Sequence, residues 1–167
     1  MLLNSELLAH YLYGSLADLL LKNGLKLTTA ESCTGGLIAA VCTSISGSSD
    51  WFERGFVTYS NEAKTEQLGV DAALIAEHGA VSELVARAMA FGAIRHSRAQ
   101  VSVAVTGIAG PTGGSAAKPV GTVWFGFSVN GFLLSELQQF AGDRAAVREA
   151  TVQYALQRLV ELLSAQH

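Results

Sequence analysis

Residues 28–64 decide the fold and read TTAESCTGGLIAAVCTSISGSSDWFERGFVTYSNEAK. The short apolar stretch 25–30, which ends in β-branched residues, predicts a strand, and the apolar run 37–45 predicts a helix. The polar segment 31–36, ESCTGG, joins the two and carries adjacent glycines. A strand-to-helix turn of this kind directs free backbone N–H groups outward at the positive end of a helix dipole. We therefore expect an anion site here, for a phosphate or for the oxyanion of an acyl transfer.

Ser32 lies where the predicted strand gives way to the predicted helix. This position would expose its hydroxyl as a nucleophile, with the amides of Thr34, Gly35 and Gly36 as an oxyanion hole. The motif is not G-x-S-x-G, because alanine and threonine stand where the glycines would be. In the alternative interpretation Ser32 only caps the helix and the glycines only pack. Cys33 is a further candidate nucleophile, since thiolates are stabilised at helix N-termini, but no histidine accompanies it nearby.

A second hydroxyl cluster, residues 46–49, follows the predicted helix and includes Ser49, and Tyr59 and Lys64 come next. A buried lysine loses its proton more readily and can then activate a serine. A lysine in a short helix is ordinarily a solvated residue, so the prediction of a catalytic role for Lys64 depends on the hydroxyl residues near it. Serines, a tyrosine and a lysine beside a backbone anion site are the components of a metal-free hydrolase. The four histidines are scattered and the cysteines are not paired, so neither a metal site nor a cofactor is predicted.

Residues 107–121, GIAGPTGGSAAKPVG, form a long stretch without periodicity, which is typical of a functional loop. Gly107 allows close backbone approach to a ligand, and Thr106 offers a hydroxyl at the end of the preceding strand. The glycine spacing is not G-x-G-x-x-G, and no G-x-x-x-x-G-K-[ST] is present, so a dinucleotide or NTP fold is disfavoured. Arg144 opens the last helix and would pair with a phosphate bidentately, although a surface role is the simpler interpretation.

The remaining sequence predicts helices that alternate with strands, followed by a late hairpin. Asn130-Gly131 between two strand patterns is a strong hairpin signal. Together these elements imply a mixed sheet with helices on both faces. The expected helices are 5–22, 37–45, 61–68, 72–78, 82–97 and 143–163, and the expected strands are 25–30, 56–59, 101–105, 122–129 and 133–140.

Composition limits the classes of function. The chain of 167 residues is half hydrophobic and carries a net charge of −3 with a pI near 5.8, which argues against a general nucleic-acid surface. Its low charge and mean hydropathy of +0.33 suggest that a subunit partner covers some apolar surface. The N-terminal leucines are not preceded by a basic segment, and nowhere are 18 consecutive residues apolar, so neither a signal peptide nor a membrane span is expected. Cys33 and Cys42 would lie on opposite sides of an ideal helix, which predicts reduced thiols and a cytoplasmic location.

Several blocks of the sequence, in order, resemble the CinA C-terminal domain family. They are TTAESCTGG, GSSDWFERGFVTYSNEAK, HGAVSE, GIAGPTGGS, KPVGTVWFGF and the GDR that opens the last helix. The resemblance covers about residues 5–163 and is strongest to the stand-alone, nicotinamide-nucleotide amidohydrolase form of the family. It implies a single three-layer α/β/α domain with a mixed sheet over residues 1–167, usually dimeric or larger.

The activity implied by the resemblance is hydrolysis of nicotinamide mononucleotide to nicotinate mononucleotide and ammonia, in pyridine nucleotide salvage. The implied mechanism uses a Ser/Lys pair and no metal. Ser32 is favoured as nucleophile by its place at a helix start, while Ser49 is an alternative nucleophile, a proton shuttle or a substrate ligand. A non-catalytic nucleotide-binding or regulatory member, or a hydrolase of another amide, are the alternative functions. The residues implied by motif match are Ser32, Ser49, Tyr59, Lys64, Thr106 and Arg144.

Overall fold

The computed structural model describes residues 6–165, which fold around one five-stranded sheet. The strand order is β2-β1-β3-β4-β5. The first three strands run parallel, and β4 and β5 form an antiparallel hairpin at one edge, so the sheet is mixed, as predicted. The strands are β1 (Leu27–Glu31), β2 (Phe52–Val57), β3 (Val101–Gly107), β4 (Thr122–Val129) and β5 (Phe132–Gln139).

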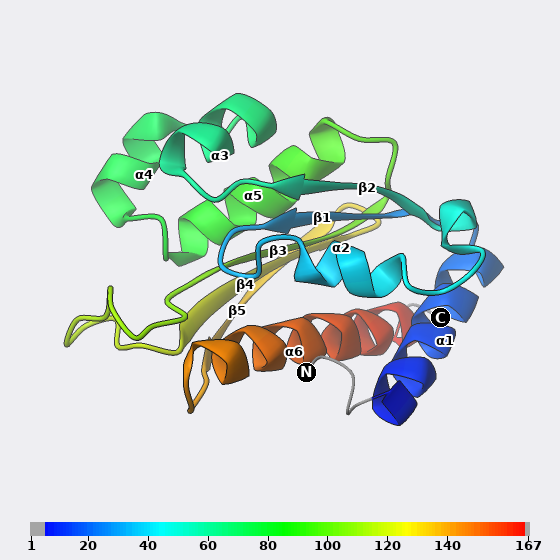
Figure 1. Cartoon of the computed structure of the whole chain (residues 1–167). Helices are drawn as coiled ribbons and strands as arrows, with labels where there is room; N and C mark the ends of the chain where they lie inside the picture. Colours follow the sequence, from blue (N-terminus) through cyan, green and yellow to red (C-terminus); the bar gives the residue numbers. More distant parts are fainter. Residues whose placement is uncertain (1–5, 166–167) are drawn as a thin grey trace.

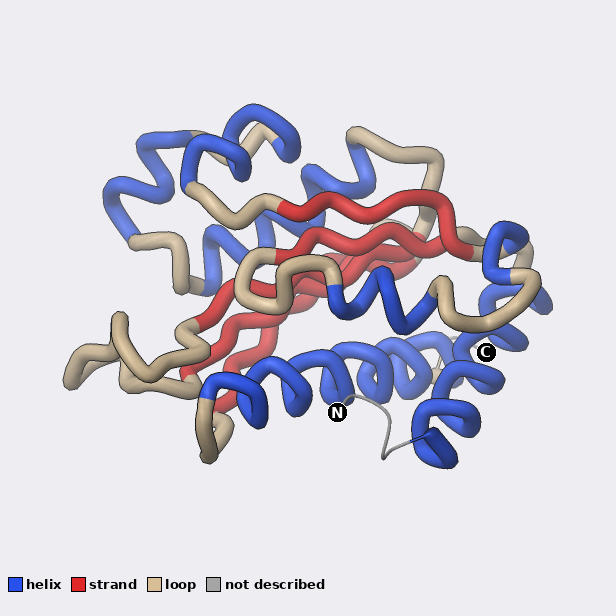
Figure 2. Tube along the Cα trace, in the orientation of Figure 1, coloured by secondary structure: helices blue, strands red, loops and turns tan. Residues whose placement is uncertain are grey.

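Helices cover both faces of the sheet (Figures 1 and 2). One layer contains α1 (Glu6–Lys22), α2 (Leu37–Cys42) and α6 (Arg144–Ser164), and the other contains α3 (Asn61–Leu68), α4 (Ala72–His78) and α5 (Glu83–Arg95). The predicted three-layer α/β/α architecture is confirmed. Within the described chain, no helix has both the length and the apolar character that a membrane crossing requires.

Alternating side chains of β4 separate the two hydrophobic cores. Phe125 and Phe127 are fully buried toward α6, and their rings stack with centroids 6.1 Å apart. Gly126, between them, faces α5, where a Cβ atom would lie 2.3 Å from the carbonyl oxygen of Ala86. Because that position has no side chain, the backbone of α5 packs directly on the sheet. Because side chains alternate between the two faces of a strand, the large residues of β4 face α6 and the glycine faces α5, which lets α5 approach the sheet closely.

The chain leaves the parallel strands in two directions. From β1 it crosses to β2 through α2 on one face, and from β2 it returns through α3, α4 and α5 on the other face to β3, on the far side of β1. Neighbouring connections that cross on opposite faces leave a crevice at the carboxyl ends of the strands. This crevice positions the site described below.

Most predicted elements agree with the structure to within about two residues at each end, and two differ by more. The second strand spans Phe52–Val57 rather than 56–59, because its polar residues face solvent at the edge of the sheet and so hide the strand pattern. Helix α2 ends at Cys42 rather than at residue 45, because the hydroxyls of Thr43 and Ser44 bond back to carbonyls of the last turn. The predicted start of the first helix, Ser5, lies outside the described residues.

Candidate active site

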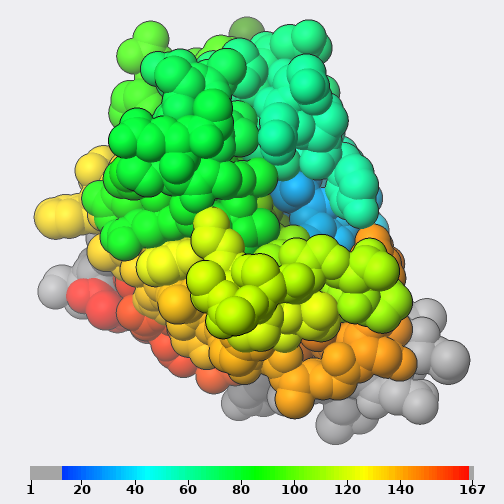
Figure 3. All heavy atoms as spheres, turned by 90° about the vertical axis from the view of Figure 1, so that its left-hand side faces the viewer, coloured from blue at the N-terminus to red at the C-terminus, as the bar shows by residue number. Residues whose placement is uncertain are grey.

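A cavity of about 210 Å³ opens at the carboxyl ends of the parallel strands. Figure 3 views this end, where the blue chain near residue 30 lies in a hollow between the teal and green helices and the yellow-green loop with the orange start of α6. The cavity brings together seven of the residues singled out from the sequence, which come from segments far apart in the chain. It is lined by Ser32, Cys33, Tyr59, Asn61, Lys64, Ala80, Val81, Thr106, Gly107, Ala109 and Arg144.

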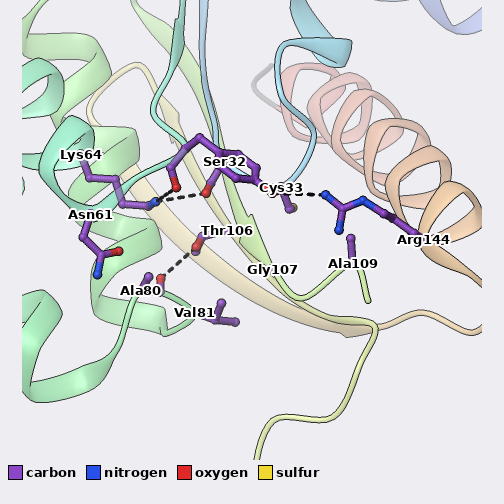
Figure 4. A pocket seen from close by; sticks show the side chains of 11 residues that line it. Ser32, Cys33, Asn61, Lys64, Ala80, Val81, Thr106, Gly107, Ala109 and Arg144 are labelled. Atoms are coloured by element: carbon purple, nitrogen blue, oxygen red, sulfur yellow. Dashed lines mark hydrogen bonds between the residues drawn. The ribbon is translucent and has the colours of Figure 1, made fainter. Parts of the chain in front are cut away.

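Lys64 and Ser32 form the centre of this cavity (Figure 4). The Nζ atom of Lys64 lies 3.0 Å from Oγ of Ser32, although 32 residues separate the two in sequence. The lysine is only 1% exposed, and no carboxylate pairs with it among residues 13–165, whose side chains the structure describes. An amine and a serine hydroxyl therefore meet in a sheltered place, as the sequence predicted.

Three main-chain carbonyl oxygens also contact the lysine amine. Nζ lies 3.0 Å from the carbonyl oxygen of Thr58, 3.3 Å from that of Tyr59 and 3.4 Å from that of Ser60. Burial lowers the pKa of Lys64 below its ordinary value, because the charged ammonium loses its hydration. The amine thus has four oxygen partners, these three carbonyls and the Ser32 hydroxyl. A lysine amine with a lowered pKa next to a serine hydroxyl can act chemically as a general base for that hydroxyl.

Local capping explains why Lys64 points back toward the sheet. Ser60 is the N-cap of α3, and its Oγ accepts a hydrogen bond from the backbone N–H of Ala63 at 3.0 Å. The helix thus begins directly after β2, and Lys64 lies in its first turns beside the carbonyls of the strand end. The predicted helix 61–68 is confirmed, with Ser60 as its cap.

The turn after β1 presents Ser32 without making it a helix cap. Its backbone N–H donates to the carbonyl oxygen of Val105 in β3 at 3.1 Å. The N-cap of α2 is Gly36, at φ 103°, and Gly35 before it has φ 59°. Both conformations favour glycine, which explains the adjacent pair in the sequence. The interpretation of Ser32 as a cap is therefore wrong.

Several amides in and after this turn are occupied from within the chain. The carboxylate of Glu31 accepts hydrogen bonds from the N–H groups of Ile38 and Ala39, and the N–H of Gly35 donates to the carbonyl of Ser32. Thr34 is fully buried and donates its hydroxyl to Glu31. Thr34, Gly35 and Gly36 are consequently not among the residues that line the cavity. Of the three amides that we expected to be free for an anion, that of Gly35 already has a carbonyl partner, and the Glu31 carboxylate occupies two amides further along, in α2.

Arg144 and Tyr59 lie at the cavity together. The Nη2 atom of Arg144 donates to the Tyr59 hydroxyl at 3.2 Å, and Nη1 donates to the carbonyl oxygen of Gly110 at 2.9 Å. The tyrosine is 63% exposed, so its ring borders the opening. No carboxylate lines the cavity, whereas a guanidinium and an amine do. The site is suited to a small anionic ligand.

Thr106 and Gly107 lie at the cavity for reasons of packing. The hydroxyl of Thr106 donates to the carbonyl oxygen of Ala80 at 2.9 Å, which fixes the segment before α5 against the end of β3. A Cβ atom at Gly107 would lie 2.7 Å from a methyl carbon of Val123 in the neighbouring strand. The glycine is therefore required by β4, whether or not a ligand approaches it.

Ser49 is not brought to the cavity within one chain. It is exposed, in the 3₁₀ turn Ser48–Asp50 that precedes β2. Strands β1 and β2 are parallel, with Leu27 beside Phe52, so this turn lies at the amino ends of the strands. In Figure 1 the segment between α2 and β2 is at the right, while the loops that form the cavity are at the left.

Cys33 lines the cavity next to Ser32, but it does not behave as an activated thiol. Burial raises its pKa to about 12, so the thiol keeps its proton at neutral pH. Asn61, Ala80 and Val81 are lining residues that the sequence analysis did not assign to the site. They lie within the blocks SNEAK and HGAVSE, and only the return of the chain to the sheet brings them to the cavity.

Fold and site together define a class of protein: a three-layer α/β/α domain with a serine–lysine pair in a cavity at the carboxyl ends of its parallel strands. The chain belongs to the CinA C-terminal domain family, whose family model matches residues 10–163.

Relatives of similar length carry the name nicotinamide-nucleotide amidohydrolase PncC. The protein of Escherichia coli K12 is 57% identical over 137 residues, 81% of this chain and 83% of that protein, and that of Pseudomonas putida is 56% identical over 82% and 86%. A "CinA-like protein" of Citrifermentans bemidjiense is 55% identical over 84% of this chain but only 34% of its own length.

Solved structures of CinA-related proteins share the fold. The competence damage-inducible protein A of Klebsiella pneumoniae superposes with a TM-score of 0.91 at 40% identity, over 95% of this chain and 99% of that one. The competence/damage inducible protein of Agrobacterium tumefaciens gives 0.85 at 46% identity, over 90% and 94%.

Proposed function

We propose that this chain hydrolyses the carboxamide of nicotinamide mononucleotide, releasing nicotinate mononucleotide and ammonia for the salvage of pyridine nucleotides. The observation that carries the proposal is the buried contact of 3.0 Å between the Lys64 amine and the Ser32 hydroxyl. The names of the relatives supply the substrate, since several at 54–57% identity are nicotinamide-nucleotide amidohydrolases. Ser32 is the nucleophile in this proposal rather than Ser49, because only Ser32 lies beside the amine.

The reaction begins with proton transfer from the Ser32 hydroxyl to the neutral amine of Lys64. The serine oxygen adds to the carboxamide carbon, and the tetrahedral intermediate carries the negative charge on the former carbonyl oxygen. The Lys64 ammonium then gives its proton to the leaving nitrogen, so that ammonia departs and an ester on Ser32 remains. Water attacks this ester with Lys64 again as base, and the carboxylate product leaves.

The backbone N–H of Cys33 is the oxyanion donor that we assign. It directly follows the nucleophile, as the corresponding amide does in serine hydrolases with a nucleophile elbow. Within the described residues it donates no hydrogen bond to another backbone group. The N–H of Gly35 and those at the start of α2 are bonded to Ser32 and Glu31, so they are less suitable.

Arg144 holds the substrate phosphate in this proposal. Two of its donors contact Tyr59 and Gly110, and a guanidinium has five, so donors remain for a phosphate. The exposed ring of Tyr59 borders the pyridine ring of the substrate. The positive character of the cavity favours a nucleotide over the corresponding nucleoside, which lacks the phosphate and carries a net positive charge.

Two further expectations from the sequence stay predictions. We expect a homodimer or larger homo-oligomer, and exposed apolar side chains such as Phe91 and Phe132 are available for a subunit contact. Sedimentation equilibrium of the purified protein measures this directly. The cytoplasmic location rests on the two unpaired cysteines.

Incubation of the purified protein with nicotinamide mononucleotide tests the function. We expect ammonia and nicotinate mononucleotide in equal amounts, and Ser32→Ala should abolish both. Ser49→Ala is the matched control, because its hydroxyl lies at the other end of the sheet. Tight binding of the nucleotide without turnover would favour a non-catalytic member of the family. Turnover of other carboxamides but not of this one would favour a different amidase.

A further inference from the structure

A buried carboxylate lies immediately before the nucleophile. Glu31 ends β1 and is 0% exposed. Its Oε1 atom accepts hydrogen bonds from Oγ1 of Thr34 at 2.6 Å and from the N–H of Ile38 at 2.8 Å, and Oε2 accepts from the N–H of Ala39 at 3.1 Å. A carboxylate buried without such partners would be strongly destabilising, so these three donors account for its presence. They connect the end of the strand to the first turn of α2, across the turn that carries Ser32.

An arginine holds the same turn from the opposite side. Arg148 comes from α6, more than 110 residues further along the chain. Its Nε atom donates to the carbonyl oxygen of Cys33 at 3.1 Å, and Nη2 donates to that of Thr34 at 3.2 Å. Nη2 also lies 3.6 Å from where a Cβ atom at Gly35 would be, so the guanidinium covers the turn closely.

Neither Glu31 nor Arg148 lines the cavity, so neither touches the substrate. Arg144, which does line it, precedes Arg148 by four residues, and this spacing places the two on the same face of α6. The same helix therefore borders the ligand with one arginine and contacts the backbone beside the nucleophile with the next.

We propose that Glu31 and Arg148 are positioning residues: they fix the backbone of residues 32–34 so that the Ser32 hydroxyl stays on the Lys64 amine. This inference rests on the proposed role of Ser32 as nucleophile. A displacement of about 1 Å in a reacting group lowers a rate about 100-fold. We call Glu31 and Arg148, with their contacts to this turn, the clamp. Loss of either residue should lower kcat about 100-fold, because the serine would no longer be held on the amine. KM for the substrate should change little, because the residues that bind the substrate are intact.

The test uses four variants of the full chain: Glu31→Gln, Arg148→Ala, Arg148→Lys and, as matched control, Arg158→Ala. Arg158 is also on α6, but its guanidinium pairs with Glu136 and Glu161, away from the turn. Glu31→Gln keeps the shape of the side chain but opposes an NH₂ group to a backbone N–H. Arg148→Lys keeps the charge but loses the fork that reaches two carbonyls. Thermal unfolding of each variant identifies any that fail to fold.

Two readouts are needed. The first is kcat and KM with nicotinamide mononucleotide. The second is the rate at which a fluorophosphonate labels Ser32, which requires an activated serine but not the substrate. We expect Arg148→Ala to lower kcat and the labelling rate together by about 100-fold, and millimolar guanidinium chloride to restore part of both. Arg158→Ala should show neither loss nor rescue, and Glu31→Gln and Arg148→Lys should lie between.

The outcomes separate this inference from the proposed function. If the unchanged protein labels at Ser32 but does not hydrolyse the nucleotide, slower labelling of Arg148→Ala still supports the clamp, while the proposed function fails. Equal labelling rates in Arg148→Ala and Arg158→Ala would overturn the clamp, as would a loss confined to KM. No labelling of Ser32 in the unchanged protein would overturn both.

Discussion

Replacement of Lys64 by methionine tests the proposed base through stability as well as activity. General bases contribute about 100- to 10,000-fold to a rate, so we expect kcat of Lys64→Met to fall by about 1,000-fold or more. Methionine fills a similar volume in a place that is 1% exposed in the structure, so the fold should persist. Lys64→Arg should be equally inactive, because an arginine does not give up its proton in proteins.

The lowered pKa of Lys64 also predicts how the free energy of unfolding changes with pH. Burial lowers the pKa of Lys64 in the folded protein, whereas the unfolded chain has the ordinary value of about 10.4. Between these two pKa values the unfolded state binds more protons at this residue than the folded state, so the free energy of unfolding rises with pH. One proton corresponds to at most about 1.4 kcal/mol per pH unit. The stability advantage of the unchanged protein over Lys64→Met should therefore grow with pH across that window.

Urea unfolding of the unchanged protein, Lys64→Met and Ser32→Ala between about pH 7 and 10 measures this difference. Ser32→Ala is the control, because it is inactive by the same mechanism yet keeps the buried amine and its carbonyl partners. Its stability should follow that of the unchanged protein with pH. A difference between the unchanged protein and Lys64→Met that is flat, or that shrinks as pH rises, would refute the reasoning. The amine would then rest as an ammonium and could not accept the serine proton.

Three further predictions concern the turn, the phosphate and the sheet. Gly36→Ala should lower the free energy of unfolding by about 1–2 kcal/mol, because Gly36 has a positive φ. Gly14→Ala should raise it by about 0.5–1 kcal/mol, because Gly14 lies in α1 with no atom within 4 Å of an added Cβ. Urea unfolding measures both, and equal effects would contradict the left-handed conformation of Gly36 in the turn. Arg144→Ala should raise KM for nicotinamide mononucleotide about 10- to 100-fold and leave turnover of the nucleoside unchanged, whereas an equal loss on both would exclude phosphate binding. Gly126→Ala should lower stability by about 1–3 kcal/mol or more, since its Cβ would meet the Ala86 carbonyl, and a change below about 0.5 kcal/mol would show that α5 does not pack this tightly.

Local signals explain which parts of the fold were predictable. Asn130 and Gly131 both have positive φ, which is the backbone that a two-residue hairpin requires, and β4 has the predicted bounds. The caps Ser82 and Asp143 accept hydrogen bonds from backbone N–H groups three residues later, as their residue types indicate. Each of these features depends on a few consecutive residues, so the sequence contains all the information needed.

The site was predictable only in part, because it depends on contacts between distant segments. The sequence identified Lys64 and Ser32 by the chemistry of their side chains. The two meet in space because β1 and β2 are parallel, so that the segments after both strands lie at the same end of the sheet. The clamp was missed because a glutamate at a strand end and an arginine in a helix are individually ordinary, and only the fold places them on one turn. Ser49 was included because it belongs to a hydroxyl cluster and to a block that resembles the family, whereas the direction of β2 puts it at the opposite end of the sheet within one chain.

The position of α6 at the end of the described chain has a consequence for biosynthesis. All five strands, the serine and the lysine leave the ribosome before Arg144 and Arg148 do. At a translation rate of about 5–20 residues per second, the 21 residues of α6 take about 1–4 seconds to synthesise after the strands. Polypeptides that end before Arg144 would keep both reactive side chains but lose the two arginines that we propose bind the phosphate and position the turn. Fragments that end before Arg148 should thus be catalytically silent.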